Sequence, residues 1–338
     1  KAIPGGINTT LDEALQQSKP LRAMYDGDER LHRLIDTARA IEGMPRHAST
    51  HAAGVVITEQ PVYAYVPLAS NDGALVCQYQ MTTLEELGLL KMDFLGLRNL
   101  TVLEDAARRV RRRVPDFQVE RIPLDDKKTF DMLAAGRTVG VFQLESAGIT
   151  SVCMGLRPRS IEDITAVIAL YRPGPMESIP RFLACSAHPE RITYQHPLLE
   201  PILAVTYGCI VYQEQVIEIF RQLAGFSLGQ ADMIRRAMSK KKEAVITAER
   251  AAFVHGDPAR SIPGAVANGV PEQTANAIYD EILAFASYAF NKAHAVSYAI
   301  VSYRTAYMKR NYPHEYMAAL LTSVLDNTPK VTEYIAEC

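Results

Sequence analysis

The chain has 338 residues, of which 48% are hydrophobic and 22% are charged, and its formal net charge is −2. At roughly 150 residues per domain this length suggests about two domains, and the composition is typical of a folded globular protein and excludes a disordered chain. No apolar run approaches the ~18–20 residues that a membrane-spanning helix needs, and no secretory signal peptide opens the sequence, so no membrane partner is expected. The near-neutral charge does not exclude nucleic acid, because local basic clusters matter more than the sum.

The five cysteines are scattered along the chain, and none forms a C-x-x-C motif. Neither a disulfide framework nor a cysteine zinc site is therefore expected, and a reducing cytoplasm fits best. The sequence starts at Lys1 within what reads as running sequence. We therefore expect an interior fragment of a longer protein.

The opening segment predicts a small helical region. A cap at Thr10 or Asn8 starts a first helix within residues 8–19, and apolar residues at helical spacing predict a second over Glu29–Glu42. Gly43 is expected to end this second helix.

A β-rich segment begins near Thr50. Three short runs have β character, namely GVVIT (54–58), LVCQYQ (75–80) and LLKMDF (89–94). An Asn-Asp-Gly turn signal at Asn71 lies among them. The segment predicts a small sheet of at least three strands.

From about Leu97 the pattern is helical almost to the end. The clearest predicted helices cover 99–113, 126–135, 144–155, 161–170, 212–224, 230–241, 271–284, 297–311 and 313–325. Residues 251–270 read as a surface loop. The fold class predicted is therefore α+β and mostly helical, with a small sheet and a large helical domain attached.

Lys91 and Asp93 are the first candidate site. Side chains alternate across a strand, so these two residues share one face, while Met92 and Phe94 share the other, which can pack inward. The carboxylate could bind Mg²⁺, and the ammonium group could neutralise phosphate oxygens. An ordinary ion pair on a solvated face is the alternative.

A cluster of arginines is the second candidate. It consists of Arg108, Arg109, Arg111, Arg112 and Arg113, at the end of one predicted helix. A helix C-terminus favours cations, but five arginines exceed that need. Contact with DNA phosphates is therefore one interpretation, and a solvated helix end is the other.

The run from Asp232 to Lys242 is the third candidate. It carries Arg235 and Arg236, then Lys240, Lys241 and Lys242, with no acid after Asp232. A triphosphate of about four negative charges suits such an array, because arginine offers bidentate contacts to oxygen. A solvated helical face is again the alternative.

The stretch from Tyr288 to Tyr298 interleaves aromatic, cationic and hydrogen-bonding side chains, which can hold a nucleobase and its phosphates. A single histidine such as His294 is more often structural. His47 and His51 have the i, i+4 spacing of metal ligands, but the chain leads into a strand there, so no metal pair is expected. Walker, G-x-G-x-x-G, G-x-S-x-G and H-E-x-x-H motifs are absent from the sequence.

In this order the segments resemble the alpha (polymerase) subunit of bacterial DNA polymerase III, the C-family replicative polymerases. The matching stretches span nearly the whole chain: RHASTHAAGVVI (46–57), LLKMDFLGLRNL (89–100), VGVFQLESAG (139–148), ALYRPGPM (169–176), YGCIVYQEQV (207–216), GQADMIRRAMSKKK (229–242) and FASYAFNKAHAVSYAIVSYRTAYMKRNYP (285–313).

The resemblance implies a domain layout and an activity. Residues 1–48 would be part of a helical thumb, residues 49–98 the C-terminal part of a nucleotidyltransferase-type palm, and residues 99–338 most of the fingers, incomplete at the C-terminus. The intact enzyme would add deoxynucleotides to a primer 3′ end by two-metal transfer with two Mg²⁺ ions. Its partners would be primer-template DNA, deoxynucleoside triphosphates and, through regions absent here, other replicase subunits such as the sliding clamp.

The resemblance also implies residue roles. Asp93 would be the third metal-binding acid, and Lys91 would contact the triphosphate. The nucleotide site would include Arg235, Arg236, Asn291, Lys292 and His294, with Gln143, Ser146 and Arg172 in motifs nearby. Arg108, Arg109, Arg112, Lys240 and Lys241 are the residues expected to contact DNA.

One departure bears on activity. The family's first two acids form an Asp-x-Asp motif upstream of the stretch that matches residues 1–48, and the only such motif in this sequence, Asp26-Gly27-Asp28, lies at a helix-to-helix joint. We therefore expect this chain alone to be inactive. The alternative is a non-catalytic nucleic-acid-binding protein in which Lys91, Arg235 and Arg236 are plain phosphate contacts.

Overall fold

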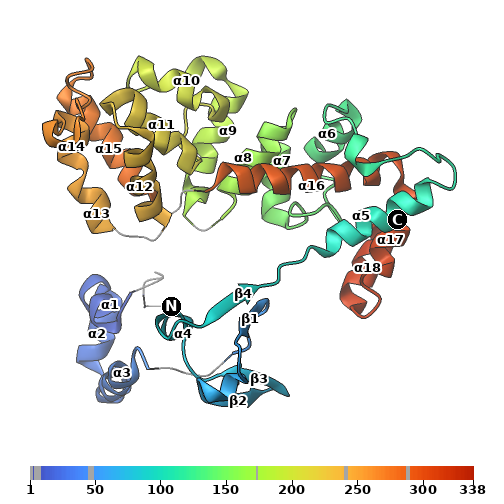
Figure 1. Cartoon of the computed structure of the whole chain (residues 1–338), viewed down its shortest axis with the longest axis horizontal. Coiled ribbons are helices and arrows are strands. Elements are labelled where there is room, and N and C mark those ends of the chain that lie inside the picture. Colours follow the sequence, from blue (N-terminus) through green and yellow to red (C-terminus); the bar gives the residue numbers. More distant parts are fainter. Residues whose placement is uncertain (1–2, 4–8, 45–48, 173, 240–242, 287–289) are drawn as a thin grey trace. The chain divides into compact units, whose positions relative to one another are not determined.

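The computed structural model describes residues 3, 9–44, 49–172, 174–239, 243–286 and 290–338. The chain divides into two compact units, residues 1–96 and residues 97–338 (Figure 1). All five cysteines are free thiols. Among the described helices, none combines the length and the apolar character needed to cross a bilayer.

Residues 1–96 begin with three short helices, α1 (Leu11–Gln17), α2 (Lys19–Gly27) and α3 (Glu29–Ile41). Thr10 starts α1 with a capping box, in which its hydroxyl accepts from the Glu13 backbone N–H and the Glu13 carboxylate accepts from the Thr10 N–H. The helix predicted within residues 8–19 ends before Ser18, because the Ser18 hydroxyl caps α2. The small core here consists of Ala14, Leu15 and Leu21.

The strands that follow are β1 (Gly54–Ile57), β2 (Leu68–Asn71), β3 (Ala74–Cys77) and β4 (Leu90–Asp93), with α4 (Met81–Glu86) before the last. The prediction of one sheet with at least three strands is wrong for the described residues. Instead β1 pairs antiparallel with β4, and β2 pairs antiparallel with β3. Strand β2 was not predicted, because its sequence LASN has little β-branched or aromatic character.

The prediction that Met92 and Phe94 pack inward is also wrong. Met92 is 42% exposed and Phe94 is 64% exposed. The opposite face of β4 is the more covered one at its centre, since the Lys91 side chain is 17% exposed. The reason is that β4 has β1 as its one paired strand among the described residues, so no full sheet buries its apolar side.

Residues 97–338 are helical. The helices are α5 (Arg98–Val110), α6 (Lys127–Ala134), α7 (Ala147–Leu156), α8 (Ile161–Leu170), α9 (Ile179–Ala187), α10 (Glu200–Leu203), α11 (Gln213–Ala224), α12 (Leu228–Ser239), α13 (Glu243–Ala248), α14 (Arg250–His255), α15 (Glu272–Ala286), α16 (Lys292–Asn311), α17 (Pro313–Thr322) and α18 (Thr328–Glu337). Every helix predicted for this region is present, α8 with the predicted ends and the others with shifted ends. A mostly helical protein with a few strands is therefore confirmed.

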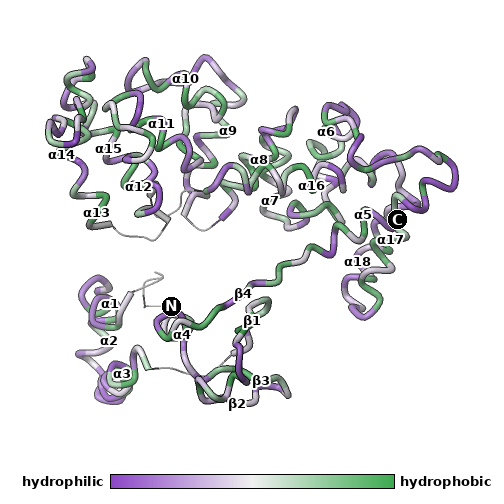
Figure 2. The backbone as a smooth tube through the Cα atoms, viewed as in Figure 1, coloured by the Kyte–Doolittle hydropathy of each residue, from purple (hydrophilic) through white to green (hydrophobic). Residues whose placement is uncertain are grey.

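Two apolar cores hold this unit together. One is formed mainly by α5–α8 with α16–α18, and the other by residues between Leu199 and Ile282. Helix α16 runs alongside α8, and α17 packs on α5 (Figure 1). Apolar and polar stretches alternate along these helices, as expected where each buries one face (Figure 2).

The prediction of a surface loop over residues 251–270 is wrong. This segment contains most of α14, and its Phe253 is fully buried. The Phe253 ring lies 4.9 Å from that of Phe220 and 5.2 Å from that of Tyr279, measured between centroids. The Gly and Pro residues of the segment shape turns at the surface of a core to which its apolar residues contribute.

Candidate functional site

The Lys91–Asp93 pair lies in residues 1–96, on β4. Lys91 Nζ donates to Asp93 Oδ1 at 2.6 Å. Gly54 of β1 stands opposite Asp93, and the His51 Nδ1 atom accepts the Gly54 N–H at 2.6 Å. A Cβ atom at Gly54 would lie 2.8 Å from both His51 Nδ1 and Lys91 Cε, and 3.1 Å from Asp93 Oδ1. Glycine therefore lets three polar side chains converge at one point of the strand pair.

The electrostatics of this pair keep the carboxylate charged. The hydrogen bond from Lys91 holds the pKa of Asp93 below its usual range, and the charge of Lys91 acts in the same direction. The Asp93 side chain is 44% exposed, so a cation from solvent can reach it. Sequence reasoning considered His51 only with His47, which lies outside the described residues.

The donor set does not by itself fit two Mg²⁺ ions. A two-metal site holds its ions about 3.5–4 Å apart and requires several carboxylate ligands. Within the part of the chain that the structure describes, no three His, Cys, Asp or Glu side chains are grouped to hold a metal ion. Asp93 can therefore supply one ligand.

A cavity of about 500 Å³ lies in the helical unit. It is lined by Gln143, Glu145, Ser146, Ile149, Ile168, Tyr171, Arg172, Phe290, His294 and Tyr298. The residues come from the loop before α7, from α7 itself, from α8 and the turn after it, and from the start of α16. Four residues predicted for the nucleotide site, Gln143, Ser146, Arg172 and His294, thus meet in one place.

Aromatic rings and one guanidinium group form a wall of this pocket. The Arg172 guanidinium lies 4.1 Å from the Phe290 ring centroid, a cation–π contact. The His294 ring lies 5.5 Å from that of Phe290 and 4.3 Å from that of Tyr298. Burial lowers the pKa of Arg172, but an arginine in a protein keeps its charge at neutral pH. The pocket therefore offers one half-buried positive charge beside stacked rings.

The start of α7 adds backbone donors. Ser146 is the N-cap residue, but its side chain makes no capping hydrogen bond. Gly148 follows in the first turn, where a Cβ atom would overlap the Tyr171 hydroxyl. The glycine therefore lets Tyr171 pack against the helix start. Together the Ser146 hydroxyl and the first N–H groups of α7 form an environment that favours an anion.

Asn291 and Lys292 lie beside the pocket without lining it. Asn291 Oδ1 accepts the His294 backbone N–H at 2.8 Å and so caps α16. The Glu214 carboxylate accepts the Lys292 backbone N–H at 3.0 and 3.1 Å. Lys292 Nζ lies 5.5 Å from the Tyr212 ring centroid. These contacts fix the start of α16 and hence the direction of the His294 side chain.

Arg235 and Arg236 are not among the residues that line this pocket. Asp232 Oδ1 accepts from Arg235 Nε at 2.7 Å, and its Oδ2 accepts from Arg236 Nε at 2.8 Å. Hydrogen bonds from both guanidinium groups lower the pKa of Asp232. The Arg236 side chain is 71% exposed, whereas that of Arg235 is 28% exposed. Lys240 and Lys241 lie outside the described residues.

The arginine cluster at the end of α5 is partly neutralised. Arg108 pairs with Asp105, Arg111 pairs with Glu104, and Arg113 pairs with Glu315. Arg109 and Arg112 make no ion pair with any described residue. These two arginines are therefore the members of the cluster whose charge is available to a partner.

Two polar residues that line the pocket, Glu145 and Tyr171, were not singled out from the sequence. They lie within the stretches VGVFQLESAG and ALYRPGPM, so the motifs contained them. Tyr298 is the last residue of the aromatic stretch that begins at Tyr288, and it was likewise not assigned to a site. The contact of Tyr171 with Gly148 depends on the packing of α7 against α8, which periodicity does not show.

Comparison with known families gives two matches. Residues 99–260 match the family model described as the bacterial DNA polymerase III alpha subunit finger domain. Residues 1–96 match the one described as the bacterial DNA polymerase III alpha NTPase domain. The two matches meet where the chain divides into its two compact units.

Curated proteins similar to the chain are bacterial DNA polymerase III alpha subunits. That of Thermus aquaticus is 48% identical over 334 residues, which are 97% of this chain and 27% of the relative. That of Bacillus subtilis is 47% identical over 339 residues, covering 100% of this chain and 30% of the relative. That of Staphylococcus epidermidis is 46% identical, covering 100% and 31%. The chain thus spans about 30% of the length of these relatives.

Proposed function

The chain belongs to the family of bacterial DNA polymerase III alpha subunits. We therefore propose that it forms part of a replicative DNA-directed DNA polymerase. The partners proposed are primer-template DNA and deoxynucleoside triphosphates, and the location proposed is the bacterial cytoplasm. In this proposal residues 99–338 are fingers, residues 49–98 belong to the palm, and residues 1–48 belong to the thumb. Contact with a sliding clamp is proposed for the longer alpha subunit.

The observation that carries the proposal is the pocket around Arg172. A deoxynucleoside triphosphate presents a flat base and an anionic tail of about four charges, and the pocket combines ring faces with a cation and a helix start. We propose that His294, Phe290 and Tyr298 contact the base or sugar. Arg172, Ser146 and the first N–H groups of α7 would contact phosphate oxygens, with Gln143 at the rim.

The Lys91–Asp93 pair is proposed to act on the metal-bound phosphates of a deoxynucleoside triphosphate. Asp93 would contribute one carboxylate ligand to Mg²⁺, which when bound supplies charge neutralisation at the reacting phosphate. Lys91 would hold Asp93 in place by its hydrogen bond and would contact phosphate oxygens. Arg235 and Arg236 are proposed to meet the triphosphate once it competes with Asp232 for their N–H groups.

We also propose that the 338-residue chain alone does not extend a primer. Two-metal transfer needs several carboxylates around the ions, and Asp93 belongs to no group of three possible ligands within the described residues. Primer extension above background by the purified chain, lost in Asp93→Asn, would overturn this proposal.

Calorimetric titration of the chain with dATP in Mg²⁺ tests the pocket assignment. We expect saturable binding that Arg172→Met weakens roughly tenfold or more, since a charge-assisted contact to phosphate contributes about 1.5–3 kcal/mol. Arg221→Met is the matched control, because Arg221 makes an i, i+3 ion pair with Glu218 and does not line the pocket. Equal loss in both variants, or no binding to the unaltered chain, would refute the assignment.

A non-catalytic nucleic-acid-binding protein is the second candidate. Arg109 and Arg112, which form no ion pair with the residues that the structure describes, favour it. This function predicts DNA affinity that falls with salt and ignores dATP. The double change Arg109→Ala with Arg112→Ala should then reduce the slope of log K against log[salt] by the amount expected for about two phosphate contacts. Salt-dependent DNA binding together with no dATP binding would favour this candidate over the polymerase.

A further inference from the structure

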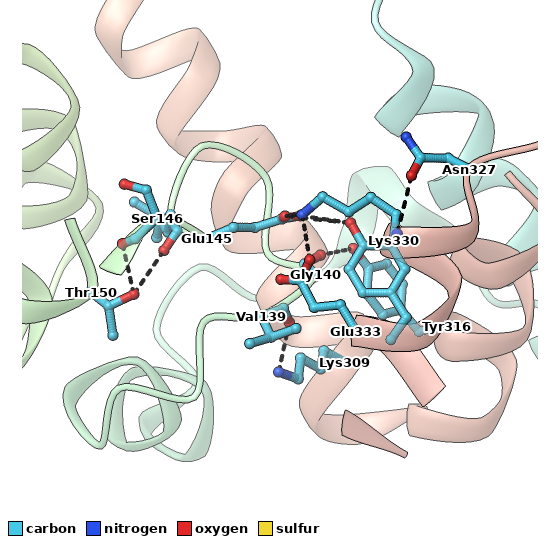
Figure 3. A network of polar contacts seen from close by, with 12 residues as sticks. Val139, Gly140, Glu145, Ser146, Thr150, Lys309, Tyr316, Asn327, Lys330 and Glu333 are labelled. Carbon is cyan, nitrogen blue, oxygen red and sulfur yellow. Dashed lines mark hydrogen bonds and ion pairs between the residues drawn. The ribbon is translucent and has the colours of Figure 1, made fainter. Parts of the chain in front are cut away.

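Helix α18 contacts the pocket through a carboxylate that lines it. Lys330 Nζ lies 3.0 Å from Glu145 Oε2, and Tyr334 Oη donates to Glu145 Oε1 at 3.1 Å. Glu145 is one of the pocket residues, and its side chain is 25% exposed. Figure 3 shows Glu145 extended from the loop toward Lys330. The pocket wall is thus bonded to a helix that lies about 185 residues later in the sequence.

The charge of Glu145 is out of place in a pocket for an anion. A carboxylate beside a phosphate group repels it, and partial burial strengthens the repulsion. Lys330 offsets part of this charge, since its Nζ also lies 2.8 Å from Glu333 Oε2, and Tyr334 shares the charge by hydrogen bonding. Burial raises the pKa of Tyr334 to about 12, so the phenol stays protonated and remains a donor. The ligand would otherwise meet an unbalanced negative charge.

Helix α18 also acts on the other end of the loop, through Lys309 of α16. Lys309 Nζ donates to the carbonyl oxygens of Val139 at 2.7 Å and Arg137 at 3.2 Å. Glu337, at the end of α18, pairs with Lys309 Nζ at 2.7 Å, and the Lys309 side chain is only 8% exposed. Helix α18 therefore acts on the loop twice, once through Lys309 and once at Glu145.

Between these two points the backbone of the loop adopts a positive φ angle at two residues. Gly140 has φ +72°, and Gln143 has φ +63°, a left-handed conformation that a non-glycine residue adopts at some cost. The Tyr316 hydroxyl donates to the Gly140 carbonyl oxygen at 2.6 Å (Figure 3). The Phe142 N–H donates to Thr305 Oγ1 at 3.1 Å. Contacts from α16, α17 and α18 therefore position Gln143 and Ser146 in the pocket.

We propose that Lys330 and Tyr334 are positioning residues of the pocket. They hold the Glu145 carboxylate away from the bound anion, and through it they order the loop of residues 137–146. Their effect on ligand affinity rests on the proposed function of the pocket as a nucleotide site, whereas the ordering of the loop does not.

Four variants of the 338-residue chain test this inference: Lys330→Met, Lys330→Arg, Lys330→Met combined with Glu145→Gln, and the control Lys127→Met. The control removes an exposed i, i+4 pair with Asp131 from α6. Two quantities are measured, namely hydrogen exchange of the 137–146 peptides without ligand and the affinity for dATP in Mg²⁺ by calorimetry.

We expect Lys330→Met to speed exchange in the loop and to weaken dATP binding roughly tenfold, which is about 1.4 kcal/mol. Lys330→Arg should stay near the unaltered chain, and the double variant should recover most of the affinity. Glutamine keeps an acceptor for Tyr334 but carries no charge, so this recovery would not follow if Lys330 merely stabilised the fold.

Loop exchange that is the same in Lys330→Met and Lys127→Met would overturn the inference. Unchanged dATP affinity in Lys330→Met, or no recovery in the double variant, would also overturn it. If the unaltered chain binds no dATP while loop exchange responds to Lys330→Met, the nucleotide assignment fails and the positioning of the loop by α18 stands.

Discussion

The two candidate sites differ in how much structure supports them. The pocket around Arg172 is formed by residues on three helices and on the loops next to them, and one of the two large cores lies beneath it. The Lys91–Asp93 pair lies on a two-stranded sheet, in a unit whose buried cluster has three members, Ala14, Leu15 and Leu21. The first site is preorganised by packing, whereas the second depends on a few hydrogen bonds around Gly54.

This difference has a physical basis. A fully buried side chain contacts many neighbours, so its position is determined several times over. An exposed ion pair is held by one contact in water and contributes little to stability. Perturbations of the core should therefore affect the helical unit strongly, and perturbations of caps and ion pairs should be visible mainly in residues 1–96.

The largest effect should come from Phe220→Ala in the second core. Phe220 is fully buried, and its ring lies 5.0 Å from that of Phe226 and 4.9 Å from that of Phe253. Its loss should reduce the free energy of unfolding of the helical unit by about 3–5 kcal/mol. Urea unfolding followed by hydrogen exchange measures this change peptide by peptide.

Leu228→Ala is the control, since Leu228 is 60% exposed and should matter little. Peptides from residues 9–44 should keep their exchange rates in both variants. A matching rise there would mean that the two units unfold as one, and the contrast between them would fail.

Sequence reasoning predicted the helical unit well where a cap or a strong period marks the helix. Helix α8 was predicted at 161–170 and observed at Ile161–Leu170, with Ser160 as its cap. Helix α16 was predicted from residue 297 but starts at Lys292, because Asn291 caps it and Glu214 binds its first N–H. That second contact joins residues 78 positions apart, and no local pattern contains it.

The sites were predictable to different degrees. The family motifs supplied Gln143, Ser146, Arg172 and His294, and the structure shows that these meet in one pocket. The role of Lys330 could not be predicted, because its partner Glu145 is brought close only by the packing of α18. In residues 49–96 the alternation of β4 correctly placed Lys91 beside Asp93, but pairing of strands is a non-local property, and the single predicted sheet was wrong.

A smaller effect is expected from Thr10→Ala at the start of α1. The change removes the acceptor for the Glu13 N–H and should cost about 1 kcal/mol. Because the buried cluster of the described part of these helices is small, that loss should increase hydrogen exchange throughout residues 9–44. Thr10→Ser retains the hydroxyl and is the control. Exchange that rises only in α1 would show that the three helices are not one cooperative unit.

The smallest effect concerns the charge of Asp93. Lys91→Met removes the hydrogen bond that lowers the pKa of this carboxyl, so that pKa should rise toward the usual aspartate value. A depressed pKa in the folded state favours folding above the unfolded-state pKa, and this contribution disappears as the pH falls through the folded-state pKa. The pH dependence of unfolding should therefore flatten slightly at acidic pH in the variant.

Carbon-13 NMR titration of the Asp93 carboxyl measures the shift directly, with Lys91→Arg as the control that keeps the donor. An unchanged pKa in Lys91→Met would show that Lys91 does not determine the charge state of Asp93. The hydrogen bond from Lys91 would then not distinguish Asp93 from an ordinary exposed acid.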